Sequence, residues 1–443
     1  MRRPARVLAA IVVVGAMGVA GISGAGAAPE PPATAADPAT TCRGDGPAAV
    51  ALLPTVEPLV QQYLGDHRDD GWRMPGLAIA IVAPDPAGGA LIIRFSCGVT
   101  AEGGSDPVTT ATRWEIGSET KLFTAAVFAR FLLDGTLARD DRLVDLLPTG
   151  PVPDSDFCAD DGNAITLLDL ATHNSGLTDY PHNKTWGDLD PTGRQHYTQT
   201  KLFDSLATYP PDLCAGLVFR PPGTGYRYSD WGFALLGTVL ANVYAPTPET
   251  DPPAYGPMIA DLVTGPLGMT ATELEPLVTP ADLATPTCQA GMVSPCPFDN
   301  VNAFAGAGGL ISSIGDMATF VKANLGYDRD TVLWPALALT REPAGLGPNP
   351  ASPMGLGWLN KPADALTALP RLEKDGGTNG MHSQTYIVPE ACWGITFLSN
   401  SDTPAPVADA GLAGKLLKVL SPKQPSPACA DPAALPLDPA FTG

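Results

Sequence analysis

The segment from Trp114 to Ala126 has the sequence WEIGSETKLFTAA and contains the pattern S-x-x-K at Ser118 and Lys121. Residues 121–133 are almost entirely apolar, and a helix that is apolar on nearly every side is a buried helix. Side chains three residues apart share one face of a helix, so we expect Lys121 beside Ser118 in a dry environment. Burial lowers the pKa of a lysine, and an uncharged amine can activate a serine hydroxyl. The segment therefore predicts an acyl-transfer centre at the start of a buried helix.

The S-x-x-K pattern also has a simpler interpretation. A chain of 443 residues contains about one such pattern by chance, Ser118 can serve only as a helix cap, and Lys121 can extend to the surface. No other lysine in the sequence lies three residues after a serine, however, and this one begins the most apolar helical pattern of the chain. The choice between the two interpretations depends on the rest of the sequence.

The N-terminal residues have the features of a secretory signal peptide. Three arginines are followed by an apolar run from Val7 to Ile22 and by Ala25-Gly26-Ala27, which matches an A-x-A cleavage site. An uncleaved membrane anchor is the alternative, but the run is short and rich in glycine and alanine. We therefore expect a secreted, extracytoplasmic protein with no stable membrane span after cleavage. A formal charge of −20 disfavours nucleic acid and anionic lipid as partners.

The eight cysteines predict four disulfides, because we expect the chain to be exported. Cys288 and Cys296 are close enough for a local bridge, while Cys158 and Cys214 flank one helical segment and form the next candidate pair. The pairing of the remaining four stays open: Cys42, Cys97, Cys392 and Cys429. None shows the paired short spacing of a zinc site and no H-E-x-x-H motif occurs, so we expect neither a metal nor a cofactor.

Strand patterns lie near both ends of the chain, and a mainly helical region separates them. Strands are predicted at 77–82, 91–97, 372–380, 384–388 and 393–398, and flanking helices at 47–64 and 411–420. This order predicts an α+β fold, in which one antiparallel sheet is built from both termini, is flanked by helices and carries an inserted, mainly helical subdomain within about 118–370. The predicted division is a signal peptide at 1–27, a Pro/Ala-rich spacer at 28–41, one domain at 42–420 and a Pro-rich tail at 421–443.

A second segment with site features, residues 221–240, has the sequence PPGTGYRYSDWGFALLGTVL. Its glycine-rich loop brings Tyr228 and Asp230 to the start of another buried helix, and loops before helices commonly carry site residues. A tyrosine near a cation can hold its phenolate or transfer a proton. Considered singly, Tyr228 is more often a residue of the core or of its rim.

A third segment, residues 373–380, has the sequence EKDGGTNG and precedes a strand pattern. Lys374 would provide a second cation, and the glycines, Gly377 among them, let the backbone approach a substrate closely. Considered singly, the segment is more often a turn with an exposed lysine.

Together the three patterns resemble, in order and spacing, the signatures of the penicillin-recognising serine hydrolases: Ser118-x-x-Lys121, Tyr228-x-Asp230 and Lys374-Asp375-Gly376. The resemblance is strongest to the class C β-lactamase branch with its DD-peptidase and esterase relatives, and it covers nearly the whole mature chain. It implies a β-lactamase/transpeptidase-like fold. In that branch the second signature is Tyr-x-Asn and the third is Lys-Thr-Gly. Asp230 therefore lacks the usual amide donor, and Asp375 replaces a hydroxyl residue.

The resemblance also implies roles for these residues. Ser118 would be the nucleophile, and Lys121 with Tyr228 would be the acid–base pair. The remaining positions would bind the substrate: Asp230, Lys374, Asp375, Gly377 and Asn400, the last as a residue that lines the cleft. The backbone N–H groups of Ser118 and Gly377 would form the oxyanion hole, and Lys374 would also influence the charge of Tyr228.

These residues predict an exported serine hydrolase that acts through an acyl-enzyme at Ser118. Residues 168–177, LDLATHNSGL, are most similar to D-alanyl-D-alanine carboxypeptidases and endopeptidases, which act on cell-wall peptides. A class C-type β-lactamase and an esterase are alternatives of the same class. A non-catalytic penicillin- or wall-binding module is an alternative of another class, but binding needs no activated nucleophile. His173 fits as a structural residue at a helix end, since no G-x-S-x-G motif supports a Ser-His-Asp triad. We expect a monomer.

Overall fold

The computed structural model describes residues 37–147, 165–184, 197–207, 221–246, 254–276, 279–288, 296 and 302–427. The predicted signal peptide, most of the spacer, the end of the Pro-rich tail and the candidate pair of Cys158 and Cys214 lie outside these residues. They stay predictions.

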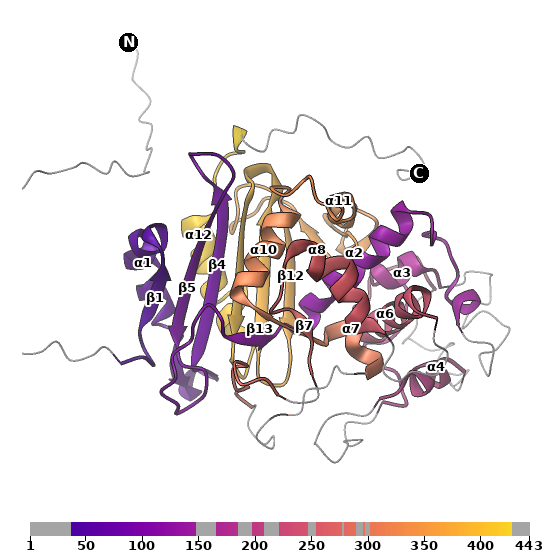
Figure 1. The fold of residues 1–443 in the computed structure, drawn as a ribbon, viewed down its shortest axis with the longest axis horizontal. Helices are drawn as coiled ribbons and strands as arrows, with labels where there is room; N and C mark the ends of the chain where they lie inside the picture. The colour runs from indigo at the N-terminus through magenta and orange to yellow at the C-terminus, as the bar shows by residue number, and fades with distance from the viewer. Residues whose placement is uncertain are drawn as a thin grey trace, which may run out of the picture. The chain divides into compact units, whose positions relative to one another are not determined.

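A nine-stranded antiparallel sheet forms the centre of the described chain, with the strand order β1-β5-β4-β14-β13-β12-β11-β10-β9 (Figure 1). The strands run as follows: β1 Cys42–Asp45, β4 Gly76–Pro84, β5 Ala90–Gly98, β9 Gly345–Asn349, β10 Ser352–Met354, β11 Leu359–Lys361, β12 Arg371–Gly377, β13 His382–Val388 and β14 Trp393–Ser399. Strands from the two ends of the chain meet where β4 pairs with β14, with Leu77 opposite Ser399. The prediction of one antiparallel sheet completed by both termini is therefore confirmed.

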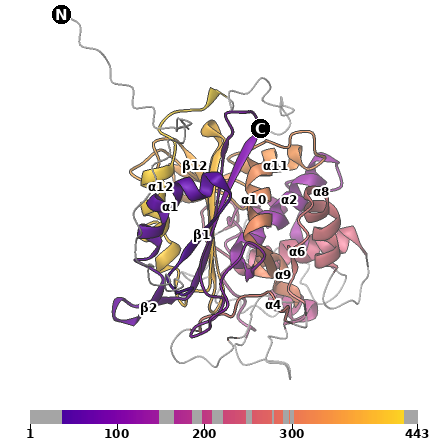
Figure 2. The same cartoon turned by 60° about the vertical axis from the view of Figure 1, so that its left-hand side comes forward.

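Each face of the sheet packs against its own group of helices. Alternate side chains of a strand point to opposite faces, so Ala78 and Ala80 of β4 join one apolar cluster while Leu77 and Ile79 join another. The second cluster lies under α1 (Pro47–Val60) and α12 (Leu412–Leu420), which cover one face (Figure 2). On the opposite face, α10 (Ile314–Asn324) packs against β4 and β14, and the other helices of the middle region lie on that side.

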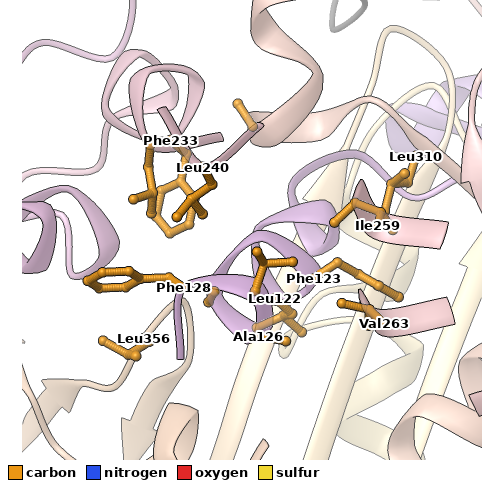
Figure 3. Packing of buried hydrophobic residues seen from close by; sticks show 14 of the residues in the cluster. Leu122, Phe123, Ala126, Phe128, Phe233, Leu240, Ile259, Val263, Leu310 and Leu356 are labelled. Carbon is orange, nitrogen blue, oxygen red and sulfur yellow. The ribbon is translucent and has the colours of Figure 1, made fainter. Parts of the chain in front are cut away.

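Helix α2 (Thr120–Leu133) runs through the middle of the larger apolar cluster. Leu122, Phe123 and Phe128 are at most 1% exposed, and Figure 3 shows them among side chains from several other elements. Phe123 stacks on Phe320 of α10, with ring centroids 4.3 Å apart. Full burial of each such side chain stabilises the fold by roughly 1.5–3 kcal/mol. The helix is therefore held firmly on all sides, and so are the residues at its start.

The sheet also contains strands that the sequence did not predict. β9, β10 and β11 fall within the region that we expected to be mainly helical, and they extend the sheet beyond β12. These strands are short, and β9 has the sequence GLGPN, so neither length nor alternation marks them. β1, with the sequence CRGD, pairs with β5 and is equally hard to recognise.

The remaining elements are further helices and two smaller sheets. The helices are α3 (Leu167–Ala171), α4 (Gln199–Ala207), α6 (Asp230–Tyr244), α7 (Tyr255–Ile259), α8 (Gly265–Leu267), α9 (Ala305–Gly308) and α11 (Trp334–Arg341). The strands of two smaller sheets are β2 (Gly65–His67) with β3 (Trp72–Met74), and β6 (Arg113–Glu115) with β8 (Leu310–Ser313) and β7 (Glu273–Leu274). Within the described ranges, no helix has the length and apolar character needed to cross a membrane.

Disulfides tie the chain together at several points. The predicted local bridge between Cys288 and Cys296 is present, and Cys42 of β1 is bonded to Cys97 of β5. Cys392 is also disulfide-bonded, and no cysteine in the described part of the chain is free. Such bridges persist in oxidising compartments, which agrees with the expected export.

Candidate active site

Ser118 lies in a tight 3₁₀ turn, Gly117–Glu119, directly before α2. Gly117 has a left-handed backbone, with φ of 50°, and a Cβ at this position would come within 2.6 Å of backbone atoms of Gly377. Only glycine fits such a position without strain. Ser118 is partly exposed while its two neighbours are buried. The turn therefore presents the hydroxyl of Ser118 at the edge of the core.

Lys121 is fully buried one turn below Ser118, and its ammonium group has three acceptors. Nζ donates to Ser118 Oγ over 2.9 Å, to Asp230 Oδ1 over 2.5 Å and to the carbonyl oxygen of Ala307 over 2.6 Å. An ammonium group has three donors, so this lysine is completely satisfied in its charged form. Tyr228 completes the set, because its hydroxyl lies 2.5 Å from Ser118 Oγ.

Asp230 is the first residue of α6, and Ser229 caps that helix by accepting a hydrogen bond from the N–H of Gly232 over 2.9 Å. Its side chain is 9% exposed and faces Lys121. Burial tends to raise the pKa of Asp230, but the charge of Lys121 and its hydrogen bond outweigh burial and lower it. The sequence suggested a lost amide donor at this position. The structure shows that the carboxylate is an acceptor for the buried lysine.

The same surroundings fix the charge states of the two groups nearest Ser118 Oγ. Burial lowers the pKa of Lys121, and the charge of Asp230 opposes this shift. Burial, followed by the charges of Asp230 and Asp375, raises the pKa of Tyr228 well above its ordinary 10. Tyr228 is therefore a neutral phenol at neutral pH, so of the two roles considered for a tyrosine near a cation, proton transfer fits its charge state and a stable phenolate does not.

Strand β12 forms one wall of the site. The backbone of Gly376 lies so close to the Ser118 turn that a Cβ there would come within 2.0 Å of the carbonyl oxygen of Ile116. Gly377, the next residue, contacts Gly117 through its backbone. The backbone segments of Ser118 and Gly377, whose N–H groups are the expected oxyanion hole, are thus in direct contact.

Lys374 and Asp375 of β12 bind each other. Lys374 is 6% exposed, and its Nζ lies 5.5 Å from the centre of the Tyr228 ring. It donates to the carbonyl oxygen of Asp375 over 2.5 Å and to its carboxylate over 3.1 Å. The carboxylate side chain of Asp375 is 79% exposed and lines a cleft of about 490 Å³, together with Tyr226, Tyr228 and Gly377. Asp375 therefore faces the cleft and compensates the charge of Lys374.

Asn400 does not line this cleft. It is fully buried after β14, where its Oδ1 accepts a hydrogen bond from the N–H of Gly76 over 2.7 Å. Its Nδ2 donates to the carbonyl oxygens of Thr100 and Thr285 over 3.1 and 3.3 Å. All its donors and its acceptor are used within the protein, so the structure gives Asn400 a role in joining three loops rather than in binding a substrate.

The family of the chain can be decided at this point. A protein-family model described as Beta-lactamase matches residues 59–418, which include every element of the site. The chain belongs to the beta-lactamase family.

Proteins named for different activities are similar to this chain. The D-alanyl-D-alanine-carboxypeptidase/endopeptidase AmpH of Escherichia coli is 26% identical over 374 residues, which cover 80% of this chain and 87% of AmpH. A D-aminopeptidase of Cereibacter sphaeroides is 26% identical over 72% of this chain and 56% of its own length. The crystal structure of a beta-lactamase/D-alanine carboxypeptidase from Yersinia pestis, complexed with citrate, is 25% identical. It has a TM-score of 0.61 and covers 79% of this chain and 93% of its own.

Several residues of this beta-lactamase-family site were not singled out from the sequence. Glu119, between Ser118 and Lys121, is fully buried and accepts a hydrogen bond from Thr385 Oγ1 over 2.9 Å. Burial raises its pKa to about 8. In the sequence, Glu119 could have been recognised as a charged residue within a turn that we expected to be buried. His382 lies opposite Gly377 on β13, where burial lowers its pKa to about 4, and only the strand register reveals this neighbour.

His173 has the structural role that the sequence indicated. It follows α3 with a left-handed backbone, φ 59°, and its Nδ1 accepts a hydrogen bond from the N–H of Ser229 over 3.1 Å. Its ring centroid lies 4.5 Å from that of Tyr228. Burial lowers its pKa well below 6.5, so the ring is neutral and supports the loop that carries Tyr228. Elsewhere in the described residues, no group of three His, Cys, Asp or Glu side chains is placed to hold a metal ion.

Proposed function

We propose that the protein is an exported serine hydrolase that forms an acyl-enzyme at Ser118 and acts as a D-alanyl-D-alanine carboxypeptidase/endopeptidase on cell-wall peptides. The observation that carries the proposal is the hydrogen-bonded set of Ser118, Lys121 and Tyr228 beside the backbone of Gly377. The similarity to the carboxypeptidase/endopeptidase AmpH of E. coli supports the choice of substrate. The disulfides support export, and the mature chain is then expected to begin near Ala28.

Acylation follows from the contacts of Ser118 Oγ. In the part of the chain that the structure describes, Lys121 and Tyr228 are the titratable groups within hydrogen-bond distance of this atom. Burial lowers the pKa of Lys121, and it is the uncharged amine, which has lost one of its three N–H donors, that accepts the proton of Ser118 as Oγ attacks the carbonyl carbon. Tyr228, held as a neutral phenol, donates a proton to the departing nitrogen and regains one from Lys121. The net result is transfer of one proton from Ser118 to the leaving amine.

Deacylation uses the same groups in the reverse direction. Water takes the place of the leaving amine beside Tyr228, loses a proton and attacks the acyl carbon, and Ser118 Oγ is released with a proton. In both steps the N–H groups of Ser118 and Gly377 stabilise the negative charge on the carbonyl oxygen. Asp230 holds Lys121 in position, because it binds Nζ directly.

Two alternatives use the same site. A β-lactamase or an esterase needs the same nucleophile, base and oxyanion hole, so only the cleft distinguishes these activities. A non-catalytic binding module needs neither a buried lysine nor a tyrosine on the nucleophile. The intact set of contacts around Ser118 therefore favours turnover over binding.

The decisive experiment assays purified mature protein with a D-Ala-D-Ala stem peptide, a cephalosporin and a p-nitrophenyl ester, with Ser118→Ala as the control. Release of D-alanine from the stem peptide, absent in the variant, would support the proposal. Hydrolysis of only the cephalosporin or only the ester would assign the corresponding alternative activity. Stable labelling by penicillin without turnover of any substrate would point to a binding module.

A further inference from the structure

The cation that faces the substrate cleft is already paired. Lys374 Nζ donates to the carboxylate and to the carbonyl oxygen of the neighbouring residue, Asp375. Of the two, Asp375 is the exposed one, at 79% against 6% for the lysine side chain. An anion that enters the cleft therefore meets the carboxylate of Asp375 before it reaches the ammonium group of Lys374.

The other charges near the cleft give no surplus of positive charge. The described residues of its lining include the carboxylates of Glu373, Asp375 and Asp409 but the ammonium group of Lys374 as their only cation. Arg371, buried behind the lining, pairs with Glu373 over 2.9 Å and lies 3.8 Å from Asp409. These pairs leave no cation in the described lining uncompensated.

The second cation of the site, Lys121, is also paired within the protein and cannot bind a substrate carboxylate. Lys121 is fully buried, and all three of its donors are used, one of them by Asp230. The two histidines of the lining, His173 and His382, are neutral because burial lowers the pKa of each, that of His382 to about 4.

From these pairings we propose that Asp375 is a specificity-determining residue that disfavours substrates with a free carboxylate next to the scissile bond. The site then prefers substrates without a free carboxylate at that position, such as peptide cross-links whose leaving amine has no neighbouring carboxylate, C-terminally amidated peptides and neutral esters. The inference rests on the proposed acyl transfer at Ser118, and it narrows the proposed peptidase activity to its endopeptidase part.

The test is a comparison of matched substrates that differ only in this charge. We expect kcat/KM for the C-terminal amide of a diacetyl-lysyl-D-alanyl-D-alanine peptide to exceed that for the free acid by roughly tenfold or more. Asp375→Asn, which keeps an oxygen acceptor for Lys374, and Asp375→Thr should each reduce this ratio by a similar factor. Raising the salt concentration should narrow the ratio in the unaltered protein, because the carboxylate is exposed to solvent.

Asp106→Asn is the matched control, because Asp106 is an exposed residue that does not line the cleft. It should leave the ratio unchanged. A preference of the unaltered protein for the free acid, or a ratio that neither Asp375 variant changes, would overturn the proposal.

A second pair of compounds separates this inference from the proposed peptidase activity. Benzylpenicillin and its methyl ester differ in the same charge, and acylation of Ser118 by each can be timed by intact-protein mass spectrometry. Faster acylation by the methyl ester, with the difference reduced in Asp375→Asn, would support the role of Asp375 even if no peptide is cleaved. Equal kcat/KM for the free acid and the amide of the D-alanyl-D-alanine peptide would instead support the peptidase activity and reject the role of Asp375.

Discussion

Lys121 Nζ and Asp230 Oδ1 lie 2.5 Å apart in an ion pair that is almost completely removed from water, with side-chain exposures of 0% and 9%. The pair joins the start of α2 to the start of α6, so it connects the segment of the nucleophile with that of Tyr228. Removing one member of a buried pair leaves an uncompensated charge and is strongly destabilising. A replacement that keeps the shape but removes the charge is therefore the informative one.

Asp230→Asn should shift the acidic limb of the pH profile. The negative charge of Asp230 raises the pKa of Lys121, so its removal lowers that pKa further, and the lysine becomes a free base at lower pH. We expect the acidic limb of kcat/KM to move to lower pH by about one unit or more. Asp106→Asn, at an exposed site, serves as the control. An unchanged acidic limb in a folded Asp230→Asn protein would show that Lys121 is not the base that this limb reports.

Ser118→Ala should abolish covalent labelling by a fluorescent penicillin and by a fluorophosphonate, because its hydroxyl is the nucleophile. The turn should stay intact, since Gly117 and the apolar face of α2 determine its shape. Circular dichroism and gel fluorescence together measure both properties. Ser105→Ala, in an exposed loop, should label normally. Labelling of the Ser118 variant at another serine would refute the assignment.

Lys121→Met and Tyr228→Phe should each lower kcat/KM by about 10²–10⁴-fold, because positioned proton transfer contributes this much. Both groups contact the same oxygen atom, Ser118 Oγ, over 2.9 and 2.5 Å. The double variant should therefore lose far less than the product of the two effects. Steady-state kinetics with one ester substrate measures kcat/KM for the unaltered protein, the two single variants and the double variant. Near-full activity of Tyr228→Phe would remove the tyrosine from the mechanism.

Glu119→Gln should change how stability depends on pH. The pKa of Glu119 is about 8 in the folded protein, compared with 4.5 for an ordinary glutamate, so the folded state holds this proton more tightly than the unfolded state. Between pH 4.5 and 8 the wild-type free energy of unfolding should therefore fall, relative to that of the variant, by up to about 1.4 kcal/mol per pH unit. Urea denaturation of both proteins at pH 5 and 8 measures this. A constant difference would mean that Glu119 ionises normally.

Replacing Cys42 and Cys97 together by alanine should lower the free energy of unfolding by about 4 kcal/mol, since the bridge closes a loop with a sequence separation of 55 residues. The bridge lies in the apolar cluster opposite the site, so kcat/KM of the folded variant should stay close to normal. Denaturation and activity assays on the same preparation distinguish the two effects. A loss of activity without a loss of stability would contradict this assignment.

The sequence predicted those features of the site that depend on local patterns. The spacing of Ser118 and Lys121 and the apolar helix after them predicted the burial of the lysine, and the glycine-rich segment before Tyr228 predicted a loop near the site. The glycines after Lys374 lie in β12 instead of in a turn. The central strands β4, β5, β13 and β14 were predicted because their apolar runs are long enough to recognise.

Long-range contacts determined what the sequence could not predict. The burial of Asn400 depends on the N–H of Gly76, which is 324 residues away in the chain. The neutral state of Tyr228 depends on its burial and on carboxylates from two other segments. Cys42 pairs with Cys97 because β1 and β5 are neighbours in the sheet, although β1 carries no strand pattern. None of these long-range contacts is indicated by the residues that neighbour Asn400, Tyr228 or Cys42 in the sequence.

The pairing of β4 with β14 has a consequence for the order of folding. The Ser118 turn emerges early from the ribosome, but β12 and its neighbours β13 and β14 emerge near the end of the described chain. A partly synthesised chain therefore contains the nucleophile without the strand that places Gly377 beside it. Contacts of such high sequence separation also make folding slow. The protein is thus expected to stay inactive during synthesis, and to gain its reactivity only as one of the last steps of folding.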